Sequence, residues 1–242
     1  MATTGINRKN IKKNRRSIFE VEATVTSNRA KAYATRSIIE ENRAGILKNY
    51  TAAFMGNRQL ANQNTDDVFR NRKAIIGTID AEGDVQENFK ESLTNEANLD
   101  FLEHRAELNS AVLNVNEKMV AVNQMLIDIN DTIMAANEKI VKYNAKQIGE
   151  NNKLLGGGLK PANATPSRNA ERIKKNAQRS KDTQKKALAN SKKMDAMSSQ
   201  MQANRKRIEA NAEKIMQRRE GILKNAGEIS KNQERVAKKI SP

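Results

Sequence analysis

Apolar residues recur along this chain with helical spacing, and an asparagine accompanies them every seven residues. Between positions 115 and 151 the asparagines fall at 116, 123, 130, 137, 144 and 151, and Asn109 extends the series backwards. The residues four places after these asparagines are apolar: Leu113, Val120, Ile127, Met134, Val141, Ile148 and Leu155. A seven-residue apolar repeat predicts α-helices that contact one another along a seam.

The same period occupies the first and last thirds of the chain. Asparagine stands at 7, 14, 28, 42 and 49, slips by one residue near Gly56, and resumes at 57, 64 and 71. In the last third it stands at 169, 176, 190, 204, 211, 225 and 232. Apolar residues again follow by four, from Ile11 to Ile46 and from Ile173 to Val236. We therefore expect Ile, Val, Leu or Met at position a and Asn at position d of each heptad.

Two breaks divide the pattern. The stretch GTIDAEGDVQEN begins at Gly77 and places Asp84 and Glu87 at the spacing of a capping box. The stretch GGGLKPANATPS begins at Gly156 and places Thr165 before Pro166, as at the start of a helix. The predicted segments are a basic helix over 1–76, a turn over 77–84, an acidic middle helix over 85–155, a Gly/Pro linker over 156–166 and a strongly basic helix over 167–242.

Three helices of similar length with short connections predict an all-α fold. We expect an up-down-up, elongated three-helix rod with a three-stranded coiled-coil seam. The apolar residues of the middle helix lie on both sides of its asparagines, so these amides are expected inside the seam. There they would form layers, bonded to one another or to trapped water or anions, because an unpaired buried amide costs ~1–3 kcal/mol. The alternative is that they flank a dry seam and contact solvent. The candidate layer residues are Asn109, Asn116, Asn123, Asn130, Asn137, Asn144 and Asn151.

The repeat IxxNxxx, clearest from Ile127 to Asn151, resembles segments in the stalks of trimeric autotransporter adhesins. The resemblance implies a parallel three-stranded coil in which asparagine layers surround anions. It covers the seam pattern alone, since no head domain, signal peptide or membrane anchor of that family is recognisable. It therefore favours a trimeric type of seam and not an adhesin.

Charge separates the three segments. Residues 1–77 hold 15 Lys and Arg against 6 Asp and Glu, residues 78–159 hold 7 against 14, and residues 160–242 hold 22 against 8. The net charges are +9, −7 and +14, within a chain of net charge +16. An acidic helix between two basic ones favours an intrachain bundle. The same distribution disfavours a parallel homotrimer that places three +14 segments side by side.

The composition argues against catalytic and membrane functions. The chain has no Cys and one His, His104, so it offers no thiolate metal site, disulfide framework or histidine pair. The glycines at 156–158 lack the spacing of a phosphate-binding loop. No apolar run approaches the ~20 residues of a membrane span. We expect a protein that is not an enzyme and has no metal or cofactor.

The basic surplus is the remaining functional signal, because a strongly basic protein binds phosphate polyanions through counterion release. Residues 144–242 contain no aromatic side chain, which disfavours stacking on single strands. We expect weak binding without sequence preference. The candidate contacts are Lys174, Lys175, Lys185, Lys186, Lys192, Lys193, Arg205, Lys206, Arg207, Arg218 and Arg219.

The sequence therefore favours a structural coiled-coil protein that acts as a rod, a spacer or a repeated part of a filament or virion. The alternatives are a nucleic-acid packaging protein and an adaptor that docks one partner at each end. Self-association or a larger protein assembly is expected. The basic N-terminus lacks the apolar region of a secretory signal, so we expect a cytoplasmic or virion location. Its lack of acidic residues before Glu20 leaves an organellar transit peptide as an alternative.

Overall fold

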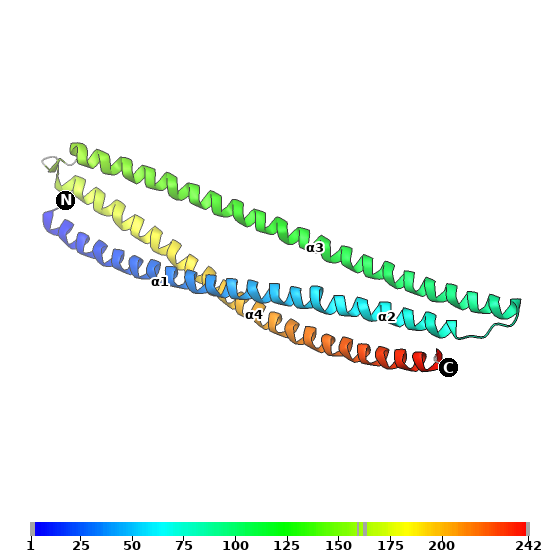
Figure 1. Cartoon of the computed structure of the whole chain (residues 1–242). Helices are drawn as coiled ribbons and strands as arrows, with labels where there is room; N and C mark the ends of the chain where they lie inside the picture. The colour runs from blue at the N-terminus through cyan, green and yellow to red at the C-terminus, as the bar shows by residue number, and fades with distance from the viewer. Residues whose placement is uncertain (1–2, 159, 162–163, 241–242) are drawn as a thin grey trace. The chain divides into compact units, whose positions relative to one another are not determined.

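The computed structural model describes residues 3–158, 160–161 and 164–240 (Figure 1). The elements are α1 (Thr4–Tyr50), the π-helix η1 (Thr51–Asn57), α2 (Arg58–Gly77), α3 (Asp84–Lys153), the short π-helical turn η2 (Leu154–Gly158) and α4 (Pro166–Ile240). These described ranges contain no strand, which confirms the all-α fold and its long helices. Linker positions 159 and 162–163 lie outside the described residues.

The chain divides into two compact units. Unit 1 comprises Met1–Gln63 with Pro161–Asn225, and unit 2 comprises Asn64–Lys160 with Ala226–Pro242. Two boundaries fall inside α2 and α4, and the third lies in the linker between Lys160 and Pro161, so each unit combines pieces of helices that are far apart in sequence. This grouping differs from a division at the two sequence breaks, because it follows contacts between helices and not their connections.

The helix ends follow local chemistry. The Thr3 side chain accepts a hydrogen bond from the Ile6 amide at 3.3 Å, and Thr165 accepts one from the Arg168 amide at 3.3 Å. The capping box expected before α3 does not form, because Asp84 is already helical and Gly83 is the N-cap without a side-chain bond. The carboxylates of Asp84 and Glu87 instead lie in the first turn, where they interact favourably with the helix dipole.

The C-terminal end of α3 is set by glycine. Gly157 has a φ of 90°, in the left-handed region that residues with a Cβ adopt only at a cost. The backbone of Gly156 has also left the helical region there. The glycine run read from the sequence therefore stops the helix by backbone conformation.

In unit 1, α1 and α4 run parallel to each other (Figure 1). A hydrogen bond joins Asn7 to the carbonyl of Pro166, another joins Asn49 to that of Ile208, and both pairs are separated by 159 positions. A constant difference along two helices requires that they run in the same direction. The helices approach closely, since a Cβ at Gly45 would lie 2.9 Å from Ile208 Cγ2.

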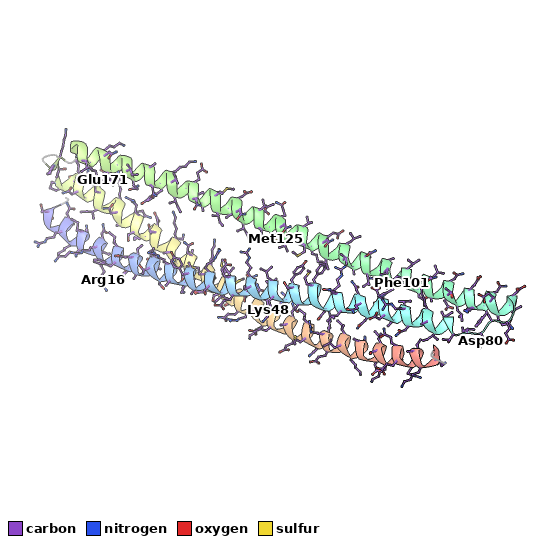
Figure 2. The ribbon with its side chains drawn as sticks, in the orientation of Figure 1. Arg16, Lys48, Asp80, Phe101, Met125 and Glu171 are labelled. Atoms are coloured by element: carbon purple, nitrogen blue, oxygen red, sulfur yellow. The ribbon has the colours of Figure 1, made fainter. Side chains whose placement is uncertain are left out.

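In unit 2, the end of α2 packs antiparallel against the start of α3. The rings of Phe69 and Phe101 meet edge to face with centroids 5.0 Å apart, and Phe101 is marked in Figure 2. Arg72 forms an ion pair with Asp100 at 2.6 Å, and Asp66 forms one with Arg105. As the α2 number rises, the number of its α3 partner falls, which defines the antiparallel direction.

The packed interior of unit 2 is small. Its buried apolar side chains are Ile76 of α2, Ala97 of α3 and Ile229 of α4. From residue 113 to residue 148, by contrast, every α3 side chain except that of Met119 is exposed. Met125, labelled in Figure 2, lies in this stretch and is 60% exposed.

Candidate functional site: the asparagine ladder and the open face of α3

The asparagine repeat of the first third forms a ladder of hydrogen bonds in unit 1. Each amide donates from Nδ2 to a main-chain carbonyl of α4, at 2.7 to 2.9 Å. The donor and acceptor pairs of this amide ladder are Asn7 with Pro166, Asn14 with Ile173, Asn28 with Ala187, Asn42 with Met201, Asn49 with Ile208, and Asn57 with Ile215. In unit 2, Asn71 donates to the carbonyl of Ile229 at 3.2 Å.

The ladder obeys one register rule. Asn14 donates to the carbonyl of Ile173, which lies three residues before Asn176 of the α4 repeat. The same relation links Asn28 to Ala187, three residues before Asn190. The acceptor is thus the carbonyl three places before the corresponding repeat position of the facing helix. Donation runs from α1 to α4, while Asn176 and Asn190 of α4 remain exposed.

The slip in the repeat near Gly56 has a structural cause. Asn49 and its acceptor residue are 159 positions apart, whereas Asn57 and its acceptor residue are 158 apart. The helical segment from Asn49 to Asn57 therefore holds one residue more than the facing segment of α4. That residue is absorbed by the π-helix Thr51–Asn57, whose turns hold more residues than α-helical turns. The insertion therefore leaves Asn57 facing α4.

On the α1 side, several side chains between α1 and α4 are small or polar, while α4 contributes partly buried apolar residues such as Ile173 and Ile208. Ser17, Thr24 and Gly45 are partly buried beside the amides, and Thr35 is buried at a repeat position that lacks Asn. The expected register placed the apolar residues of α1 in the seam with Asn. Ile39 is partly buried, whereas Ile11, Ile18, Val25 and Ile46 are about half exposed, because an amide reaches a main-chain carbonyl only when the helices approach closely.

The polar atoms left over in this seam are acceptors. Oδ1 of Asn28 and Oδ1 of Asn57 are buried without a hydrogen-bond partner among the described residues. An anion needs donors, and the Nδ2 groups of both residues already bind carbonyls. A donor such as water suits these two positions better than an anion.

The candidate layer residues of the middle helix have a different environment. Asn109, Asn116, Asn123, Asn130, Asn137, Asn144 and Asn151 are all exposed. The apolar side chains beside them are exposed too, for example Ile127 at 52%, Met134 at 60% and Val141 at 65%. We call this apolar and amide surface of residues 109–155 the open face of α3. The stacking of its amides in layers stays a prediction.

Charge does not select the neighbours in the expected way, because the two basic helices α1 and α4 pair directly in unit 1. Local ion pairs support this pairing: Lys31 with Asp195 at 2.7 Å, and Arg205 with Glu41 at 3.2 Å. All of these side chains are at least 40% exposed, so each pair contributes little, ~0–1 kcal/mol. The amide ladder and small side chains therefore outweigh net repulsion between the helices.

The candidate polyanion contacts are all exposed, but the structure does not gather them into one patch. They are spread along α4, and Arg205 is engaged with Glu41. Lys175 hydrogen bonds to Glu171 and holds the pKa of that carboxyl below its usual value.

The parallel pairing of α1 with α4 also brings together basic residues that the sequence pattern did not predict to be neighbours. Residues 8–16 of α1 carry six Lys and Arg and no acid, and the ladder sets them beside residues 167–175 of α4. That α4 segment carries another four Lys and Arg against Glu171 alone. We call these two segments the basic end of unit 1. The acid-poor N-terminus was the available signal, but its partner depends on helix direction, which the repeat does not reveal.

No catalytic arrangement emerges from the described residues. His104 is partly buried, and its Nε2 lies 3.3 Å from Thr65 Oγ1 in the α2–α3 contact. The described part of the chain has no cluster of three or more His, Asp or Glu that could hold a metal ion. Within the same residues, no helix is both long and apolar enough to cross a membrane.

Comparison with known proteins adds no relative: no protein-family model, curated protein or solved structure matches this chain.

Proposed function

We propose that this chain is a non-enzymatic structural coiled-coil protein that acts as a rod, a spacer or a repeated component of a filament or virion particle. The observation that carries the proposal is the open face of α3, which exposes apolar side chains at heptad spacing over residues 113–155. A contiguous apolar surface of this kind is typical of a protein–protein contact. Seven-residue spacing matches the contact to another helix.

The amide ladder supports the same proposal. Buried amides in a helix seam fix register and partner choice at some cost in stability. A binding protein for polyanions would need only its Lys and Arg residues. The regular placement of Asn along all three long helices is therefore better explained by assembly in a defined register.

Analytical ultracentrifugation over a concentration series, with negative-stain imaging, tests this function. We expect concentration-dependent association into elongated particles that persists at 0.5 M NaCl, because apolar contacts are not screened by salt. A protein that sediments as a single compact monomer at every concentration would contradict the structural function.

The basic end of unit 1 supports a second candidate function, sequence-independent binding of nucleic acid. Six basic residues of α1 and four of α4 on two adjacent helical segments concentrate charge that extended duplex phosphates would neutralise. Binding should weaken linearly in log–log coordinates as salt rises, with a slope of about −0.9 per phosphate contact.

A pair of matched variants separates this function from general charge. Lys12, Lys13 and Lys174 changed to Gln should reduce the salt slope for duplex DNA, because they lie in the basic end. Lys192, Lys193 and Lys206 changed to Gln remove the same charge from exposed positions elsewhere on α4. Equal effects of the two triple variants would show that net charge alone matters, and would overturn a site at the basic end.

A further inference from the structure

The ends of α2 and α4 form a small cavity in unit 2 (Figure 1). Asn71 of α2 donates to the carbonyl of Ile229, a difference of 158 positions. By this register the last residue of α2, Gly77, is about level with residue 235 of α4, and α4 continues to Ile240. The last turn of α4 therefore extends past the end of α2, which leaves the cavity beside the turn that follows α2.

The cavity has an apolar floor. Its volume is about 410 Å³, within the ~300–1,000 Å³ typical of small-molecule sites. Ile75 lines it from α2 and Val236 from α4. Ile76 and Ile229 are each 8% exposed, so both helices are anchored near the cavity. The turn after α2 is held too, because Thr78 donates from its amide and its hydroxyl to the carbonyl of Ile75, at 3.1 and 2.7 Å.

The charged side chains that line the cavity are all cations. Arg235, Lys238 and Lys239 are spaced as i, i+3 and i+4, so they lie on one side of α4. Among the residues that the structure describes, no acid lines the cavity, and the nearby acid Glu228 pairs with Lys231 at 2.8 Å. The cavity therefore favours an anion, and three cations close together suit a group with more than one negative charge.

We propose that this cavity binds a phosphate monoester that carries an apolar group. Such a phosphate bears ~1.5–2 negative charges at neutral pH and has three acceptor oxygens. Arg235 can bind two of these oxygens at once, while Lys238 and Lys239 act as point charges. Ile75 and Val236 contact the apolar group. A carboxylate has one charge and two oxygens, so it satisfies this set of donors less fully.

Two sources can supply this chemistry. One is a small phosphorylated compound free in solution, and the other is the headgroup of a phospholipid whose phosphate is a monoester. Clusters of Lys and Arg attract anionic headgroups as well as free phosphates. The test therefore has two arms, with phenyl phosphate as the free probe and vesicles that contain phosphatidic acid as the lipid probe. The site is additional to the structural function and does not depend on it.

Matched variants separate the cavity from the net charge of the chain. Lys238→Gln combined with Lys239→Gln removes two cations of the cavity. Lys139→Gln combined with Lys146→Gln removes the same charge from exposed positions of α3 in the same unit. Ile75→Ser removes part of the apolar floor and keeps every cation. Ile75 is 51% exposed, so this variant should fold, and circular dichroism at 222 nm checks all three.

The first arm is a phosphorus NMR titration of the full chain at ~0.15 M NaCl, where long-range attraction is screened. We expect phenyl phosphate to bind ~tenfold more tightly than inorganic phosphate, because the ring covers apolar surface. The Lys238 and Lys239 variant should weaken phenyl phosphate binding ~tenfold through lost charge-assisted hydrogen bonds, and the Lys139 and Lys146 variant less than ~twofold. Ile75→Ser should reduce the preference for phenyl phosphate without weakening inorganic phosphate.

Two results of this arm would overturn the proposal. Equal weakening by the two double variants would show that net charge alone accounts for binding. Equal affinity of the natural chain for phenyl phosphate and inorganic phosphate would show that the apolar floor contributes nothing, and the proposed ligand class would be wrong.

The second arm is flotation of the full chain with vesicles. Phosphatidic acid is compared with phosphatidylglycerol, whose phosphate is a diester. Preference for phosphatidic acid that the Lys238 and Lys239 variant loses would identify a lipid headgroup as the ligand. Binding of phenyl phosphate without that preference would assign the cavity to a compound free in solution. Saturable binding of neither probe would overturn the site.

Discussion

Replacing Asn42 by Ala tests whether the amide ladder stabilises unit 1. Asn42 is 7% exposed, and its Nδ2 donates to the carbonyl of Met201 at 2.9 Å. The variant loses this hydrogen bond, a net change of ~0.5–1.5 kcal/mol. It gains helix propensity, since Ala is favoured over Asn by up to ~0.7 kcal/mol in a helix. Asn190→Ala is the control: Asn190 is exposed on α4 of the same unit, so its replacement gives the gain in helix propensity without the loss of a ladder bond.

Relative to Asn190→Ala, we expect Asn42→Ala to lower the free energy of unfolding by ~1 kcal/mol. In a chain of 242 residues this corresponds to a Tm lower by ~2–4 °C. Extending the change to Asn14 and Asn49 should lower it by ~3 kcal/mol, because sites at least ~10 Å apart contribute additively. Urea unfolding followed by circular dichroism at 222 nm measures each difference. Equal stabilities of Asn42→Ala and Asn190→Ala would refute a stabilising ladder.

Asn28→Ala should lower the free energy of unfolding less than Asn42→Ala in the same urea titration, because it also removes a buried Oδ1 that has no partner in the described chain. A larger loss of stability for Asn28→Ala would contradict this expectation. Gly45→Ala should be at least ~1 kcal/mol less stable than Gly221→Ala, since both gain helix propensity but only Gly45 has a Cβ site 2.9 Å from a neighbouring side chain; equal melting curves would argue against close contact of α1 with α4. Deleting Ala53 should preserve the ladder, because it removes the extra residue of η1. Deleting Ala34 should instead rotate part of α1 by ~100° and disrupt its pairing with α4. Similar melting temperatures of the two deletion variants would contradict the extra residue in η1. Changing Arg205, Lys206 and Arg207 to Glu should lower stability by only ~0–1 kcal/mol through the exposed Arg205–Glu41 pair, and it should weaken duplex binding alike for all DNA sequences in a filter-binding salt series; sequence-dependent losses would point to base recognition.

The helices and their period are accessible from the sequence, because an apolar repeat and glycine or proline breaks act locally. The start at Pro166 and the break at 156–158 are examples. The one-residue slip near Gly56 was also visible. Its absorption in a π-helix was not, because the sequence does not distinguish an inserted turn from a shift of the partner helix.

The partners of the helices were harder to predict. Net charge suggested that the acidic middle helix would lie between the basic ones, but α1 and α4 pair directly in unit 1. Exposed charges are screened, whereas the distance between helices is set by small side chains such as Gly45. A periodic pattern places Ile11 and Asn14 in one arc, but it does not say which of them meets the neighbouring helix.

The most direct test of the parallel amide ladder is a distance between spin labels on its two helices. Ala30 and Ala189 are exposed and 159 positions apart, the difference that the ladder sets for α1 and α4. Both can be changed to Cys and labelled, with unlabelled protein added to suppress distances between molecules. For parallel helices ~8–10 Å apart, double electron–electron resonance should give a narrow distribution near ~20 Å. A slip of one heptad would add an offset of ~10 Å along the axis. A broad distribution centred beyond ~35 Å would contradict the parallel ladder.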